Sequence, residues 1–252
     1  MMSNPRRGLR IEVFSVLRYR GVMPSSPPVL LLTGFGPFPR VPANATTLLV
    51  PRIADAASKT FAGISIICEI VPTEWVAGLA RVEALYAAHR PAVAVHFGVS
   101  GRATGFAVEA RARNCCAASP DAAACLPQSD RIAPDAPEFL PSTLPATLIV
   151  ERLRRRGIPA QLSRDAGNYL CNALMYRTLD LARGKDWPAR NGFVHLPTSL
   201  VDPRNPERGP LASSPLSWPQ VIDGGLEIIA ASLGRQRARP QVSPSPFALV
   251  GA

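Results

Sequence analysis

The chain has 252 residues, of which 47% are hydrophobic and 18% are charged, and its formal net charge is +10. This length suits one generous domain, and the composition excludes a disordered chain and a coiled coil. No apolar run approaches the roughly 18–20 residues of a membrane helix, so we expect no membrane partner. The arginines that carry the charge are dispersed and only 6% of residues are aromatic, so we expect no nucleic-acid partner.

The two ends differ in composition from the middle of the chain. Residues 1–27 are predicted to form a poorly ordered extension, because the stretch Pro24–Pro28 would interrupt any regular element, and Met23 is an alternative start. Residues 235–252 are rich in Arg, Pro and Ser and predict a flexible tail. Residues 28–234 are predicted to form a single α/β domain.

Within that domain, strands and helices alternate along the chain. Apolar runs predict strands at Val29–Thr33, Ile64–Val71, Ala92–Phe97, Ile158–Ser163 and Gly192–Leu196. Apolar residues at a spacing of three and four predict helices at Glu74–Arg90, Leu144–Arg156 and Tyr169–Arg183, and a last helix from the capping box Ser217–Gln220 to about Leu233. The alternation predicts a three-layer α/β/α sandwich around a mostly parallel twisted sheet. Ligands of such sheets bind beyond the carboxyl ends of the strands.

The five cysteines are odd in number and form no C-x-x-C pair, so neither a disulfide framework nor a zinc site is indicated, and we expect no bound metal. The basic N-terminus has no sustained apolar segment of the kind found in secretory signals. These features predict a reducing, cytoplasmic setting, in which free thiols can take part in chemistry.

One cysteine lies where a thiolate would be stabilised. Asn168 is the expected N-cap of the helix after the turn at 165–167, which puts Cys171 in the first helical turn. The unpaired backbone N–H groups and the helix dipole favour a negative charge there, so Cys171 is a candidate nucleophile. The alternative is that Cys171 is a small buried hydrophobic residue, as most free cysteines are.

A nucleophilic thiol needs an imidazole partner, and the chain has three histidines. His89 ends a predicted helix, and His96 lies inside a buried strand, where a satisfied core histidine is expected. His195 lies at the carboxyl end of a strand, on the sheet edge where the Cys171 helix begins, so it is the preferred partner.

A third group normally orients the imidazole. The candidates are the acids near predicted strand ends, Glu109, Asp121 and Asp165, and the local sequence pattern does not choose among them.

Five blocks in order resemble a known family. They are Leu32–Phe38 followed by Asn44, Val71–Thr73, Ser142–Pro145 with Gly157–Pro159, Asp165–Asn172, and Phe193–Pro197. Together they resemble pyroglutamyl peptidase I, also called pyrrolidone-carboxylate peptidase, a cysteine exopeptidase that removes N-terminal pyroglutamate. The resemblance covers roughly residues 29–233, and the spacing from Cys171 to His195 is that of the family.

The resemblance implies the catalytic roles. Cys171 is then the nucleophile, His195 the general base and acid, and Glu109 the orienting acid, with residues 28–234 as the catalytic domain. It further implies thiolate acyl transfer without metal or organic cofactor, peptides with N-terminal pyroglutamate as partners, and a possible homo-oligomer.

The resemblance also implies a small apolar pocket for the uncharged lactam ring. Phe35 and Phe38 would sandwich the ring, and Asn44, Thr73 and Leu170 would line the same pocket. Apolar walls with a few amide or backbone hydrogen bonds suit such a ligand.

The sequence departs from the family pattern at several positions. The family's glycine pair after the Pro-Phe block is Pro39-Arg40 here, Val99 stands where the family has a glutamine, and Ala110 replaces the arginine after Glu109. An arginine of many bacterial members has no counterpart between Asn114 and Pro120. Two alternatives therefore stay open: a related thiol hydrolase with a shifted substrate, and a catalytically silent binding homologue.

Overall fold

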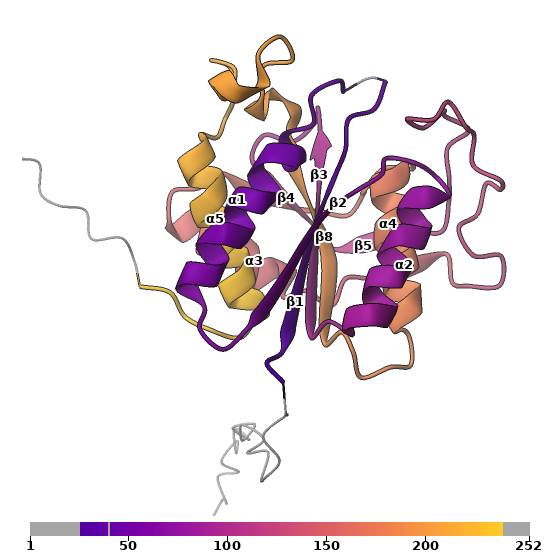
Figure 1. Ribbon diagram of the computed structural model, residues 1–252, viewed down its shortest axis with the longest axis horizontal. Coiled ribbons are helices and arrows are strands. Elements are labelled where there is room, and N and C mark those ends of the chain that lie inside the picture. Colours follow the sequence, from indigo (N-terminus) through magenta and orange to yellow (C-terminus); the bar gives the residue numbers. More distant parts are fainter. Residues whose placement is uncertain (1–25, 40, 239–252) are drawn as a thin grey trace, which may run out of the picture.

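The structure is a computed structural model that describes residues 26–39 and 41–238 (Figure 1). The predicted N-terminal extension, apart from residues 26 and 27, and most of the predicted C-terminal tail lie outside these residues. The described part of the tail is held against the body of the protein. Arg237 pairs with Asp223 at 2.9 Å, and the carbonyl oxygen of Arg235 accepts a hydrogen bond from Arg152 at 2.7 Å.

The centre of the fold is a six-stranded sheet with the order β2-β1-β3-β8-β4-β7. All neighbouring pairs are parallel except β4 and β8, which are antiparallel. The strands are β1 (Val29–Phe35), β2 (Ser65–Val71), β3 (Val93–Ser100), β4 (Phe106–Glu109), β7 (Ala160–Ser163) and β8 (Arg190–Pro197). Leu30, Leu31 and Leu32 are fully buried because the sheet is covered on both faces, as their continuous apolar run predicted.

Helices cover both faces of the sheet, which confirms the predicted three-layer α/β/α fold (Figure 1). One face carries α1 (Ala45–Thr60), α3 (Ala146–Arg155) and α5 (Trp218–Ser232), and the other carries α2 (Ala77–His89) and α4 (Leu170–Ala182). A two-stranded sheet of β5 (Arg111–Arg113) and β6 (Phe139–Pro141) packs beside α4. Among the described residues, no helix combines the length and apolar character needed to span a bilayer.

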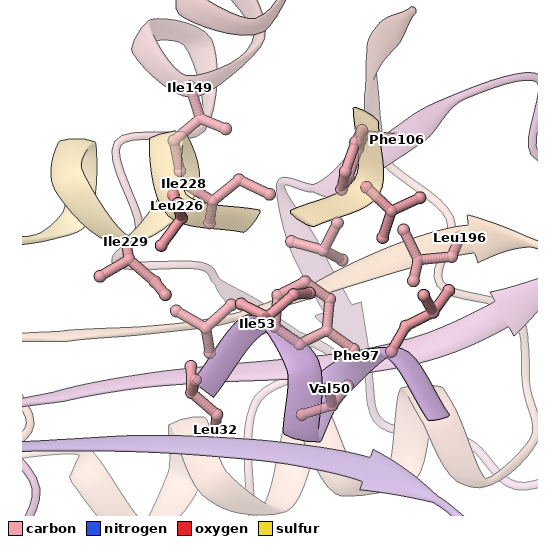
Figure 2. Packing of buried hydrophobic residues seen from close by; sticks show 14 of the residues in the cluster. Leu32, Val50, Ile53, Phe97, Phe106, Ile149, Leu196, Leu226, Ile228 and Ile229 are labelled. Atoms are coloured by element: carbon pink, nitrogen blue, oxygen red, sulfur yellow. The ribbon is translucent and has the colours of Figure 1, made fainter. Parts of the chain in front are cut away.

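Each face of the sheet has its own hydrophobic core. Figure 2 shows the larger one, where Leu32 and Phe97 of the sheet belong to the same cluster as Ile53 of α1 and Ile229 of α5. All four are fully buried, and each such side chain stabilises the fold by roughly 1.5–3 kcal/mol. The smaller cluster lies on the α2 and α4 face and includes Phe193.

Two parts of the fold differ from the sequence prediction. No helix is predicted between the first two strands, yet α1 forms there with Pro51 in its interior. Its apolar face, including Leu49 and Ile53, is fully buried, and this packing offsets the backbone hydrogen bond that Pro51 cannot donate. The short strands β4, β5 and β6 are also unpredicted, because three or four residues carry too little periodicity to distinguish a strand from a loop.

Candidate active site

Cys171 lies in the first turn of α4, as predicted, but the helix cap differs from the prediction. The cap is Tyr169, whose backbone is extended and whose side chain makes no capping hydrogen bond, so Asn168 is not the N-cap. The chain reaches this point through a turn in which Gly167 has a φ of +81° and donates its N–H to Asp165 Oδ1 at 3.0 Å. A left-handed residue is needed at that turn, and glycine adopts it without strain.

His195 and Glu109 meet across the antiparallel pair of strands. His195 lies on β8 beside Ala107 of β4, and Glu109 follows Ala107 by two residues and so points to the same face. The Nδ1 atom of His195 lies 2.8 Å from Glu109 Oε1, and both side chains are buried. This hydrogen bond leaves the Nε2 atom of the ring for Cys171.

The other two candidate acids have different partners. The carboxylate of Asp121 is buried and accepts hydrogen bonds from the backbone N–H groups of Trp75, Ala123 and Cys125. Asp165 is exposed and lies 3.4 Å from Arg102. Of the three acids that the sequence left open, the structure therefore brings Glu109 to the imidazole.

The pKa of His195 is raised although the ring is buried. Burial by itself lowers it, but a negatively charged Cys171 sulfur, a hydrogen bond with that sulfur, and the hydrogen bond and charge of Glu109 outweigh burial and raise the pKa from 6.5 to about 9. The ring is therefore poised as an imidazolium at neutral pH, within hydrogen-bonding reach of the sulfur.

His96 shows the opposite behaviour, as its predicted place in the core implies. The ring is fully buried, with Nδ1 at 2.8 Å from Thr33 Oγ1 and Nε2 at 3.0 Å from Tyr86 Oη. Burial lowers its pKa to about 3, so it stays neutral and structural. His89 is the last residue of α2, where the sequence placed it.

A cavity of about 370 Å³ opens beside the catalytic candidates. It lies over β4 and β7, on the face of the sheet opposite to Phe106 and Val108 of β4, which belong to the larger core. Its lining includes Cys171, His195 and Glu109, together with the end of β3, the side chains of Ala107, Gln161 and Ser163, and the loop before α4.

Four of the five predicted pocket residues lie at or beside the loop after β1, whereas Leu170 is the first residue of α4, and none of the five lines this cavity. The loop is held by its Gly36 carbonyl oxygen, which accepts hydrogen bonds from Asn44 Nδ2 at 3.1 Å and Thr73 Oγ1 at 2.7 Å. Asn44 also caps α1, because its side chain accepts from the Thr46 N–H. Asn44 and Thr73 thus use their side chains to position the loop.

Phe35 and Phe38, two of the predicted pocket residues, connect the loop after β1 to the catalytic candidates through ring contacts. The ring of Phe38 lies 5.6 Å from that of Tyr169, the residue before Leu170, and the ring of Phe35 lies 6.3 Å from that of Phe193. Phe193 in turn lies 4.9 Å from the imidazole of His195. Leu170 is buried in the core of this face.

Two residues at the site were not singled out from the sequence. Tyr169 lines the cavity and packs on both Phe38 and Trp75. Gly98 lies so close to the cysteine that a Cβ atom there would be 2.8 Å from Cys171 Sγ. Tyr169 could have been found from its place beside Leu170 in the cysteine block, whereas no local signal distinguishes Gly98 from other glycines at strand ends.

The site holds no obvious metal centre. Within residues 26–39 and 41–238, no three His, Cys, Asp or Glu side chains are placed to hold a metal ion. The five cysteines are free thiols. Cys171, His195 and Glu109 bring a thiol, an imidazole and a carboxylate to the lining of the cavity.

An α/β sheet that brings a helix-terminal cysteine, an imidazole and a buried carboxylate to one cavity has the arrangement of a cysteine-dependent hydrolase. Comparisons with known proteins give the family. The sequence model of the pyroglutamyl peptidase family matches residues 29–206. The chain belongs to the pyroglutamyl peptidase family.

Individual relatives agree with this assignment. The pyrrolidone-carboxylate peptidase of Gloeobacter violaceus is 33% identical over 169 residues, which are 67% of this chain and 80% of that protein. The solved structure of Bacillus amyloliquefaciens pyroglutamyl peptidase I superposes with a TM-score of 0.68 at 32% identity, covering 81% of this chain and 96% of that one. The pyrrolidone carboxyl peptidase of Pyrococcus furiosus gives 0.70 at 27% identity, covering 82% and 98%.

Proposed function

We propose that this protein is a cysteine exopeptidase that releases N-terminal pyroglutamate from peptides, with Cys171 as nucleophile, His195 as general base and acid, and Glu109 as the orienting acid. The observation that carries this proposal is the 2.8 Å contact between His195 Nδ1 and Glu109 Oε1, with Cys171 within hydrogen-bonding reach of the same ring. Membership of the pyroglutamyl peptidase family gives the substrate.

In the proposed reaction, the thiolate of Cys171 attacks the carbonyl carbon of the pyroglutamyl residue and forms a tetrahedral intermediate. The C–N bond then breaks, and the imidazolium of His195 gives its proton to the departing amine. A water molecule, deprotonated by His195, attacks the thioester carbon, and the C–S bond breaks to release pyroglutamate and the thiolate. No metal or organic cofactor takes part in these steps.

The start of α4 supports the same reaction. The first backbone N–H groups of a helix have no partner within the helix, and those around Cys171 can donate to the oxygen that becomes negatively charged. Each such donor typically contributes 10²–10³-fold to turnover.

The loop after β1 is the proposed place for the lactam ring. Phe35 and Phe38 supply its apolar walls, Leu170 closes the pocket from the helix side, and Asn44 and Thr73 belong to the same pocket. Support comes from the hydrogen bonds that hold the loop at Gly36 and from the packing of Phe38 on Tyr169, beside the cysteine helix.

The free state of all five cysteines supports the proposed cytoplasmic setting, since oxidising compartments favour paired thiols. A homo-oligomer and the absence of a nucleic-acid partner stay predictions. Light scattering on the purified protein and a gel-shift titration would check them.

A fluorogenic pyroglutamyl amide tests the proposed function in reducing buffer. We expect turnover by the native protein, loss of turnover in Cys171→Ala, and normal turnover in the matched control Cys125→Ser, which changes an exposed cysteine. Rapid alkylation of Cys171 by iodoacetamide without any turnover would favour a thiol hydrolase with another substrate. An unreactive Cys171 without turnover would favour a silent homologue.

A further inference from the structure

Three cavities are lined by residues of the loop at 164–168, and one of them contains the catalytic candidates. The cavity of about 370 Å³ contains Cys171 and His195, and its neighbours have volumes of about 280 Å³ and 230 Å³. All three share Asp165 and Gly167 in their lining, so they adjoin one another at this loop. We call this region the entrance surface.

The entrance surface is rich in arginine. Four arginines line it, and the acids in its lining are the exposed Asp165 and the buried Glu109, which is held by His195. The arginines are Arg102, Arg111, Arg113 and Arg164. They come from the loop after β3, from β5 and from the start of the 164–168 loop, so tertiary structure gathers charges that are dispersed in the sequence.

These arginines are only partly neutralised by the protein itself. Arg102 lies 3.4 Å from Asp165, but both side chains are at least 70% exposed, and such pairs contribute little. Arg113 pairs with Glu138 at 2.8 Å. Arg111 lies over the ring of Phe139, and within the described part of the chain neither it nor Arg164 belongs to an ion pair.

The arginines line different parts of the structure from the proposed pyroglutamyl pocket. The proposed pyroglutamyl pocket is built on the loop after β1, and none of its five residues lines the entrance surface. The pyroglutamyl group is itself uncharged and its amine is blocked. The acyl half of the substrate therefore carries no negative charge to pair with these arginines, whereas the leaving half, which begins at the scissile nitrogen, can carry one.

We propose that the entrance surface selects substrates whose leaving group carries a carboxylate close to the scissile bond. This inference rests on the proposed function. The carboxylate has two possible sources: an acidic side chain on the residue that follows pyroglutamate, or the free terminal carboxyl group of a pyroglutamyl dipeptide. The planar guanidinium fork of arginine suits either one, and the combined field attracts an anionic peptide before contact.

The test compares leaving groups of matched shape. Pyroglutamyl-Glu-amide, pyroglutamyl-Gln-amide and pyroglutamyl-Lys-amide isolate the side-chain charge, and pyroglutamyl-Ala with its amide isolates the terminal carboxylate. We expect kcat/KM for the Glu compound to exceed that for Gln by roughly two- to fivefold per arginine engaged, and that for Lys to be lowest. High salt should remove these differences.

Variants locate the effect on the entrance surface. The readout is the ratio of kcat/KM between acidic and neutral compounds, which cancels any change common to all substrates. Arg102→Gln should lower this ratio, Arg102→Glu should reverse the order of Glu and Lys, and Asp165→Asn should raise the ratio. Arg155 is an exposed residue of α3, on the opposite face of the sheet from α4 and Cys171. Arg155→Gln and Arg155→Glu make the same charge changes there and should leave the ratio unchanged.

The outcomes separate this inference from the proposed function. Equal kcat/KM for the Glu, Gln and Lys compounds and for pyroglutamyl-Ala and its amide at low salt would overturn the inference while the peptidase activity stands. The inference would also be overturned if the Arg102 and Arg155 variants changed the preference for acidic compounds by the same factor. The preference would then depend only on the net charge of the protein. No turnover of any pyroglutamyl compound would defeat the proposed function and the inference together.

Discussion

Gly98 of β3 leaves the space in which Cys171 Sγ meets the imidazole. A Cβ atom at position 98 would lie 2.8 Å from that sulfur and 2.7 Å from Cζ of Phe193. Gly98 is also the residue opposite His195 in the ladder between β3 and β8. The lack of a side chain at one strand position therefore lets a helix-borne thiol and a strand-borne imidazole come together.

Replacement of Gly98 should displace the sulfur. We expect Gly98→Ala to lower kcat/KM by on the order of 10²-fold, because small misplacements of reacting groups are costly, and to lower the free energy of unfolding by about 1–3 kcal/mol. Gly101→Ala is the matched control, since the nearest atom to its added Cβ, Thr198 Oγ1, is 3.9 Å away. Full activity of Gly98→Ala on the fluorogenic amide would show that the sulfur does not need this position.

The charge of Cys171 should control the titration of His195. We expect the pKa of His195 to be near 9 in the native protein and lower in Cys171→Ser, because the negative sulfur is the largest favourable influence on the imidazolium. Since the folded pKa lies above the ordinary 6.5, the stabilising contribution is complete below pH 6.5 and disappears as the pH rises through about 9. NMR of the ring protons across this pH range measures the shift, and an unchanged pKa in the variant would refute the pairing.

The carboxylate of Glu109 should affect catalysis through the imidazole. We expect Glu109→Gln to lower kcat/KM by about 10²–10⁴-fold and to move the alkaline limb of the pH–rate profile to lower pH, because the hydrogen bond and charge of Glu109 raise the pKa of His195. A role in folding alone would leave the pH profile in place.

Asp121→Asn is the matched control for Glu109→Gln, since Asp121 is a buried carboxylate that accepts hydrogen bonds from backbone N–H groups away from His195. It should reduce stability, measured by urea unfolding, much more than it reduces turnover.

The buried His96 should make the fold sensitive to acid. Its folded pKa of about 3 lies below the ordinary 6.5, so the neutral ring stabilises the fold above pH 6.5, and this contribution falls by up to about 1.4 kcal/mol per pH unit below it. His96→Leu should cost about 1–3 kcal/mol at pH 7 through the lost partners of Thr33 and Tyr86.

Because His96→Leu cannot be protonated, the difference in unfolding free energy between native protein and variant should shrink as the pH falls from 6.5. Urea titrations at several pH values measure this difference. A constant difference would show that the ring does not exclude its proton on folding. His89→Leu, at the end of α2, is the control for removing a histidine elsewhere.

Much of the fold could be predicted from local patterns. The apolar run in β1 and the capping box at Ser217 both appear in the structure where the sequence placed them. The position of Cys171 in a first helical turn was also predictable, since Gly167 and the apolar spacing of α4 are local features. The helix α1 was missed because Pro51 disfavours a helix locally, and only burial of the opposite face offsets that preference.

The sequence alone determined which residues have the chemistry of a nucleophile and a base, because helix ends, strand ends and side-chain types are local properties. The local sequence pattern left three acids open and the family resemblance named Glu109, and tertiary structure places that acid beside the imidazole and decides which charges surround the entrance. The four residues of β4 lie between β8 and β7, antiparallel to β8 and parallel to β7, and the pairing with β8 brings Glu109 to His195 from 86 positions away. Such pairings depend on the free energy of the whole packed sheet, to which short strands contribute almost no local signal.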